Sequence, residues 1–235
     1  MAVLRDYGIV LRTHKLGESD RIVSMLTMRH GLRRIVARGV RKTSSKIGAR
    51  LEPFSVVDIQ FYEGRSLDSV NQVETVALYG SAISANYEKY QVGMVIAETA
   101  YQITESATGA EQFQLLAGAL RVLANARSDP QLVRDSYMLR ALAFAGWQIE
   151  LLRCVNCQEN YYQAFFSAAL GGTVCQVCKT EPLPVLSENA IALLVALLRG
   201  DWDTAFASSS RARKEASGTV KAFARWHLER ALKSL

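Results

Sequence analysis

The residues of this chain with the clearest chemistry are its four cysteines, which form two C-x2-C pairs. Each pair turns tightly enough to direct two sulfurs at one point, and the seventeen residues between the pairs can close one pair onto the other. Thiolate is a soft ligand that suits zinc. Four protein ligands leave no position for water, so we expect one structural Zn²⁺ ion per chain rather than a catalytic one. The expected ligands are Cys154, Cys157, Cys175 and Cys178.

Two disulfides or two redox pairs are the alternative interpretations of these cysteines. Disulfides require an oxidising compartment, and the first residues lack the long apolar run and small-residue cleavage site of a secretion signal. A redox C-x2-C pair usually opens a helix after a strand, whereas Cys154 follows a predicted helix and Cys175 follows Gly171 and Gly172. Both contrasts favour the metal.

A second candidate site is the basic segment of residues 33–50, which contains no acidic residue. Guanidinium groups bind phosphate bidentately, lysines add point charge, and counterion release drives the association. Nothing in the segment would recognise base edges, so weak sequence preference is expected. A solvated loop is the alternative interpretation. The predicted DNA contacts are Arg33, Arg34, Arg38, Arg41, Lys42, Lys46 and Arg50.

Charge is distributed unevenly along the chain. Residues 1–50 hold 12 Lys and Arg against 3 Asp and Glu, whereas the remaining 185 residues hold 16 against 19. This asymmetry predicts a polyanionic partner for the N-terminal part. The most apolar stretch, residues 190–198, is too short to span a bilayer. We therefore expect a cytoplasmic protein without membrane contact.

The elements that would position these residues change type near residue 80. Five short β-rich segments, with Val57, Ile59 and Phe61 alternating with polar residues, predict a small closed barrel, most simply a five-stranded OB-fold. We expect an α+β chain of several domains: an OB-fold nucleic-acid-binding domain over 1–80, then an all-α helical domain over 81–235 with an inserted four-cysteine zinc module at 152–180. Candidate stacking aromatics on the barrel are Tyr7, Phe54, Phe61 and Tyr62, of which at least half are expected in the core.

Helical periodicity marks the rest of the chain. One long helix is expected from Ile83 to Tyr101 with an aromatic core stripe, and a second is marked by apolar residues at 113, 116, 120 and 123. Asp129 and Ser187 are predicted N-caps of two further helices, which would end at Gly146 and Gly200. A last helix is predicted over 218–235.

No phosphate-binding glycine loop, nucleophile elbow or paired helical histidines appear, which favours a binding protein over an enzyme. An RNA-binding OB-fold or zinc-ribbon module of translation or RNA metabolism is a second interpretation, and an enzyme with an unrecognised site a weaker third.

The order of several motifs resembles the bacterial recombination mediator family RecO. The matching segments are GIVLRT at 8–13, LGESDRIV at 16–23, Thr27 with Gly31-Leu32, ARGVRK at 37–42, LEPF at 51–54, and the two cysteine pairs. The resemblance implies an OB-fold, a helical domain and a zinc-finger-like insertion. It also implies binding to single- and double-stranded DNA, annealing of complementary strands, and a role in DNA repair near the nucleoid.

The resemblance further implies partners. They are RecR and the acidic C-terminal tail of the single-stranded DNA-binding protein (SSB), with which the family helps load RecA onto SSB-coated strands. A tail with a hydrophobic tip requires an apolar groove with Arg or Lys at its rim. Arg121, Arg127 and Arg140 lie near Leu-rich helix faces, but the sequence does not choose among them.

Overall fold

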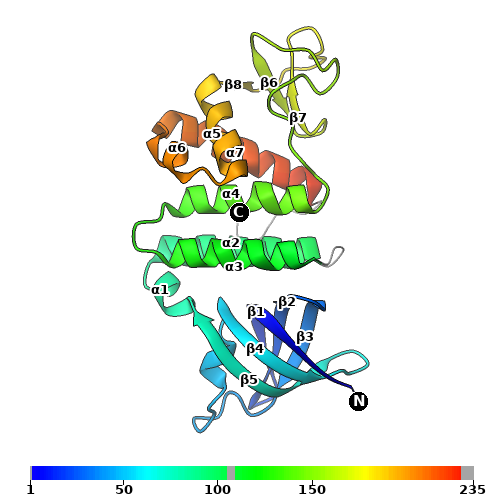
Figure 1. Cartoon of the computed structure of the whole chain (residues 1–235), viewed down its shortest axis with the longest axis vertical. Coiled ribbons are helices and arrows are strands. Elements are labelled where there is room, and N and C mark those ends of the chain that lie inside the picture. The colour runs from blue at the N-terminus through cyan, green and yellow to red at the C-terminus, as the bar shows by residue number, and fades with distance from the viewer. Residues whose placement is uncertain (1, 105–108, 229–235) are drawn as a thin grey trace. The chain divides into compact units, whose positions relative to one another are not determined.

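Five strands form a closed barrel at the start of the chain, as the sequence predicted (Figure 1). The computed structural model describes residues 2–104 and 109–228. Around the barrel the order is β1-β2-β3-β5-β4, and β4 pairs back onto β1, which is the Greek-key order of an OB-fold. All neighbours are antiparallel except β3 and β5, which are parallel. The strands are β1 (Val3–Leu16), β2 (Asp20–Thr27), β3 (Gly31–Ala37), β4 (Ser55–Tyr62) and β5 (Asp68–Leu78).

The barrel interior is built from alternate residues of the strands. Val57, Ile59 and Phe61 of β4 are fully buried, whereas Asp58 and Gln60 between them are half-buried. The buried three pack with apolar residues from each of the other four strands. The period-two prediction for this strand is therefore confirmed, and each such side chain contributes about 1.5–3 kcal/mol of burial free energy.

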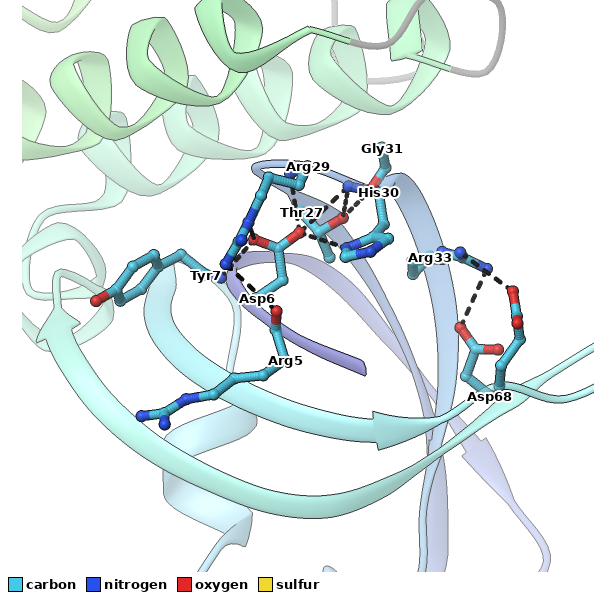
Figure 2. Close-up of polar contacts among 10 residues, drawn as sticks. Arg5, Asp6, Tyr7, Thr27, Arg29, His30, Gly31, Arg33 and Asp68 are labelled. Atoms are coloured by element: carbon cyan, nitrogen blue, oxygen red, sulfur yellow. Dashed lines mark hydrogen bonds and ion pairs between the residues drawn. The ribbon is translucent and has the colours of Figure 1, made fainter. Parts of the chain in front are cut away.

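One buried carboxylate, Asp6, holds the turn between β2 and β3 against β1 (Figure 2). Its Oδ2 accepts hydrogen bonds from the backbone N–H of Arg29 at 2.8 Å and of His30 at 3.2 Å, and lies 2.8 Å from His30 Nδ1. Its Oδ1 accepts from the backbone N–H of Tyr7 at 2.9 Å. Burial alone would raise the pKa of Asp6, but the donors from Arg29, His30 and Tyr7 outweigh it and lower that pKa below its usual 3.8.

Three helices follow the barrel within the same compact unit. They are α1 (Gly80–Ser84), α2 (Tyr87–Thr104) and α3 (Ala110–Ala124). Helices α2 and α3 lie side by side in Figure 1 and pack against each other. The predicted second helix is confirmed as α3, in which Phe113, Leu116, Leu120 and Leu123 are all buried.

Helix α2 packs on the outer surface of β1, β2 and β3. Ile9 and Leu26 are completely buried, although their neighbours Val10 and Met25 are the residues that point into the barrel. Phe54 packs against α2 at Gly93, where an added Cβ would lie 3.0 Å from its ring. The outer face that many OB-folds use for ligands is thus covered here by the chain's own helix.

The prediction of one helix from Ile83 to Tyr101 with an aromatic core stripe is wrong in two respects. The helix is interrupted between Ser84 and Tyr87, and Tyr87 and Tyr90 are 76% and 42% exposed. The buried side of α2 is aliphatic instead, because Val92, Ile96 and Ile103 face the packed neighbours. The pair Thr108-Gly109 was also expected from the sequence to break the helical run. Thr108 lies outside the described residues, and Gly109 directly precedes α3.

The second compact unit contains α4 (Pro130–Phe144), α5 (Glu188–Arg199), α6 (Trp202–Ala207) and α7 (Ser210–His227). Both predicted caps are confirmed: Asp129 accepts from the N–H of Gln131 and Leu132, and Ser187 from the N–H of Ala190. Gly200 ends α5 in the left-handed region, at φ 72°. The prediction that the last helix begins near 218 is wrong, because Ser209 caps a helix that begins at Ser210, eight residues earlier.

A small three-stranded sheet in the second unit carries the cysteine segment. Its order is β7-β6-β8, formed by β6 (Ala164–Ser167), β7 (Gly172–Val174) and β8 (Val185–Leu186). These short strands were not predicted. Across the described residues, every helix is too short or too polar to cross a membrane.

Contacts divide the described chain after Ser128, so the barrel and α1 to α3 form one unit and α4 to α7 with the small sheet form the other. This division groups parts of the chain by packing and does not test where folding domains begin. The boundary at 80/81 stays a prediction, as does the extent of the module at 152–180.

Replacing Asp6 with Asn should lower the free energy of unfolding by about 2–3 kcal/mol at neutral pH, because an amide turns one acceptor oxygen into a donor facing N–H groups. Asp58→Asn is the matched control. Asp58 pairs with Arg5, whose side chain is 62% exposed, and such surface pairs contribute only about 0–1 kcal/mol. Urea unfolding of the three proteins measures both effects.

The Asp6 effect should also depend on pH. Since folding lowers the pKa of Asp6, its stabilisation is complete above the unfolded-state pKa and is lost as the pH falls through the folded-state value, below 3.8. The stability difference between wild type and Asp6→Asn should therefore shrink in acid. A difference that stays constant down to the acid transition would contradict this role.

Candidate metal centre and nucleic-acid interface

The four cysteine sulfurs converge in the second unit. All lie within 4.8 Å of one another, and none forms a disulfide. Cys157 Sγ and Cys175 Sγ are 3.9 Å apart, close to the roughly 3.8 Å between sulfurs in a tetrahedral site with zinc–sulfur bonds of about 2.3 Å. The cluster could therefore hold a metal ion, and the donor set of four thiols fits zinc.

Each C-x2-C pair lies on a tight turn closed by backbone hydrogen bonds. In the first turn, the N–H of Gln158 donates to Cys154 O at 2.8 Å, and Gln158 adopts φ 62°. In the second, the N–H of Lys179 donates to Cys175 O at 3.1 Å, and the N–H of Cys178 lies 3.4 Å from Cys175 Sγ. Each turn is thus closed by the same hydrogen bond, from the residue after its second cysteine to its first cysteine.

The small sheet brings the two turns together. Cys175 directly follows β7, and the N–H of Val155 donates to Thr173 O at 2.9 Å, which ties the first turn to that strand. Gly172 is required there, because an added Cβ would lie 2.3 Å from Glu150 O. Cys154 is completely buried against Phe165 and Val174, whereas Cys157 is exposed.

The thiols affect one another's ionisation. Burial would raise the pKa of Cys154, but N–H groups of Cys157, Cys175 and Asn156 reverse this and lower it to about 6. Hydrogen bonding to the Cys175 and Cys157 thiols raises the pKa of Cys178 to about 12. One of the four thiols therefore ionises readily, but the ionisation of all four is unfavourable without a cation. A bound dication would stabilise the four thiolates together.

The seven predicted DNA contacts fall into two groups. The first group, Arg33, Arg41 and Arg50, forms ion pairs or hydrogen bonds with neighbouring strands and turns of the barrel. Arg33 lies 3.6 Å from both Glu63 and Asp68, and Figure 2 shows it turned toward Asp68. Arg50 donates to the backbone oxygen of Val73 at 2.6 Å. Both side chains are partly buried, so their first role is to hold strands and loops.

Arg41 is exposed, but its guanidinium donates to the backbone oxygens of Gly17 at 3.2 Å and Glu18 at 2.8 Å. It therefore ties the segment after β3 to the turn between β1 and β2.

The second group is presented to solvent. Arg34 on β3 and the loop residues Arg38, Lys42 and Lys46 are exposed. Val40, between them, is 5% exposed and belongs to the barrel core, which anchors the loop. Asp20 accepts from the N–H of Gly39 at 2.8 Å. This hydrogen bond is the largest cause of a lowered pKa of Asp20. The hydrogen bond from Ser19 and the charges of Arg38 and Lys42 lower that pKa as well.

The four candidate aromatics divide in half. Phe54 and Phe61 are 1% and 0% exposed and are core residues, as was expected for at least half of the set. Tyr7 and Tyr62 are 44% and 37% exposed on β1 and β4. Only these two could stack with a base.

An apolar groove lies in the second unit, at a place that the sequence did not specify. It has a volume of about 480 Å³ and lies between the end of α4, residues 148–152 and the end of α5. Phe144 and Leu152, both more than half exposed, line it with Leu198. Arg140 and Arg199 supply two cations, and Glu150 supplies one carboxylate. Arg140 was one of three arginines noted in sequence, while Arg199 gave no signal beyond ending a helix.

Comparison with known proteins assigns both parts of the chain. Residues 1–79 match the family model described as Recombination protein O N terminal, and residues 84–235 match Recombination protein O C terminal. A relative from Thermobifida fusca named DNA repair protein RecO is 48% identical over 237 residues, which cover 100% of this chain and 98% of the relative. Relatives of the same name from Streptomyces avermitilis and Cutibacterium acnes are 48% and 46% identical, again over 100% of this chain and 98% of each relative.

If the four thiols bind one zinc ion, replacing Cys175 with Ser should reduce bound zinc from about one per chain to a small fraction, because three ligands remain. Gln176→Ser alters an exposed residue of the same turn without touching a sulfur and should keep the metal. Elemental analysis with thiol counting tests both. Wild-type protein that holds no metal while all four thiols are reduced would refute the assignment.

Proposed function

This chain belongs to the RecO family of DNA repair proteins, and from that membership we propose that it is a non-enzymatic recombination mediator. Its role lies in DNA repair and recombination. In the proposed activity, the protein binds single- and double-stranded DNA and anneals complementary strands. Together with RecR it helps load RecA onto strands coated by SSB. We place this activity in the cytoplasm at the nucleoid.

The observation that carries the DNA-binding proposal is the exposed basic loop of the barrel. Arg38, Lys42 and Lys46 extend from a segment whose apolar residues are anchored in the core, and Arg34 lies on the adjoining strand. Asp20, a carboxylate at the base of the loop, is already bonded to Gly39 and Ser19. A phosphate backbone is the partner that suits such cations, through charge-assisted bonds and counterion release.

Annealing would follow from charge neutralisation. Two strands repel each other through their phosphates, and a basic surface that neutralises some of them lets the strands approach. Base pairing between the strands then supplies the sequence specificity, so the protein has no need to read bases. This mechanism needs no nucleotide hydrolysis.

The cysteine cluster would hold one structural zinc ion. When bound, zinc supplies folding free energy to the small sheet and its two turns. Cys154, inside the cluster with Phe165 and Val174, would couple the metal to the apolar core of the module.

RNA is the second candidate ligand, because OB-folds also bind RNA. The names of the relatives favour DNA. Competition between matched DNA and RNA oligonucleotides separates the two readings: clear preference for RNA would support a module of RNA metabolism instead.

The apolar groove of the second unit suits the C-terminal tail of SSB. The tail is acidic with a hydrophobic tip. Phe144, Leu152 and Leu198 would receive the tip, and Arg140 and Arg199 would pair with carboxylates of the tail. Of the three arginines noted in sequence, Arg121 and Arg127 do not line this groove. RecR is proposed as a partner without an assigned surface.

Changing Arg38 and Lys42 to Gln should weaken binding to oligonucleotides of every sequence. The slope of log affinity against log salt should fall by about two units, since two phosphate contacts are lost. Arg41 is left in place because it holds the loop. Arg121→Gln/Arg127→Gln removes two exposed charges from the same unit and is the matched control. Fluorescence anisotropy across a salt series measures the slope, and a strand-annealing time course should fall with it.

An unchanged slope and full annealing in a folded Arg38→Gln/Lys42→Gln protein would remove the barrel loop from the DNA surface.

A peptide with the sequence of the SSB tail should bind the full-length protein, and Arg140→Gln should weaken it by about tenfold, the loss of one charged contact in an apolar setting. Arg121→Gln is the control and should bind as wild type does. Calorimetry gives both affinities. Equal affinities for Arg140→Gln and wild type would exclude the groove.

A further inference from the structure

Helix α7 has one buried side and one basic side. Its buried side packs against α4 and α5 through Ala212, Ala216, Val220, Phe223 and Ala224. With about 100° between successive residues, four cations fall within an arc of about 80° on the opposite side. They are Arg211, Lys214, Lys221 and Arg225. From the first to the last, they extend over about 21 Å of helix.

Most of this charge lies on exposed side chains, although Lys221 is half-buried and its charge acts on the buried carboxylate of Asp135. Among the described residues, Lys214 and Arg225 have no hydrogen-bond or ion-pair partner. Arg211 pairs with Glu215 at 3.0 Å, but its side chain is 87% exposed and Glu215 also accepts two bonds from Ser187. Arg213, by contrast, points away from this side and pairs with Asp129 at 2.7 Å. The helix therefore separates a cation used for packing from cations offered to solvent.

A glycine lies in the middle of the basic side. Gly218 is exposed, and an added Cβ there would meet no atom within 4 Å, so packing does not require it. Glycine inside a helix is less favourable than alanine. Ala222 is also exposed, so the centre of the basic side carries only small residues and is bordered by long cationic side chains. A polymer backbone can therefore approach the helix closely at this point.

An exposed aromatic residue lies beside the last cation. Trp226 is 58% exposed and directly follows Arg225. The next residue, His227, stacks on Trp147 at 5.4 Å between ring centroids and meets Phe223 edge-on at 4.4 Å. This packing fixes the end of the helix while leaving the indole of Trp226 available, and an indole face beside a basic track is suited to stacking with a base.

From these observations we propose that the basic side of α7 is a second DNA-binding surface, which holds one single strand by its phosphates while the barrel loop holds another. The proposal rests on the proposed annealing function and deepens it, because annealing requires one protein to carry two strands. The charge complementarity selects a sugar–phosphate backbone, and the open centre and exposed indole suit a strand with unpaired bases.

The test uses full-length protein with short non-complementary oligonucleotides. One strand is immobilised, the protein is bound, and capture of a second, labelled strand is measured. Lys214→Gln/Arg225→Gln is the variant, because neither side chain supports the fold. Arg121→Gln/Arg127→Gln is the control with the same charge change. Wild type and control should bridge the two strands, and the α7 variant should bind the second strand about tenfold more weakly, with a salt slope lower by about two units.

The outcomes separate this proposal from the one on which it depends. Wild-type protein that binds no DNA at all would overturn the proposed function. Wild-type protein that binds DNA while the α7 variant bridges as well as the control would overturn only the role of α7. An α7 variant that bridges normally but loses the SSB-tail peptide would reassign the helix to an acidic peptide and overturn the proposal as well. Loss of bridging in both the α7 variant and Arg38→Gln/Lys42→Gln supports two separate strand sites.

Discussion

Closure of the barrel through the parallel pairing of β3 and β5 is the constraint on which the rest of the structure depends. Two parallel strands cannot be joined by a tight turn, so the chain must leave β3, form β4 elsewhere and return. The connection between β3 and β4 is consequently long. Val40 and Leu51 lie in the barrel core, and Lys42 and Lys46 between them extend into solvent. Arg41 and Arg50 instead donate to backbone oxygens of neighbouring segments. The exposed loop is thus a consequence of the strand order of the barrel, and the basic residues on this loop form the basic surface.

Polar groups have different structural roles in the two units. In the first, a single buried carboxylate collects several donors and so fixes a turn. In the second, four thiols occupy the corresponding organising position, and neighbouring thiols raise the pKa of Cys178, so their assembly favours a dication.

Much of this architecture could be predicted because local signals and tertiary packing agree. The caps at Asp129 and Ser187 are contacts made within a few residues. The alternation in β4 and the cysteine spacing are local patterns that agree with the contacts formed across the fold. The predictions from sequence were wrong where tertiary contacts determine which side chains are buried or bonded. Tyr87 and Tyr90 have the spacing of a core stripe, but the buried side of α2 is formed by Val92, Ile96 and Ile103. Arg33 and Arg50 are typical phosphate ligands in sequence, yet strand neighbours bind them first.

The packing of α2 on the barrel also has a consequence for how the chain folds during synthesis. The ribosome releases the five strands before α2, so for a time Ile9, Leu26 and Phe54 form an apolar patch on the outside of a nearly finished barrel. Such a patch can associate with other nascent chains until α2 is synthesised and packs over it. The barrel is therefore not a self-sufficient module: its solubility depends on a helix that is translated after it, and a chain terminated before α2 would be a substrate for chaperones or proteases.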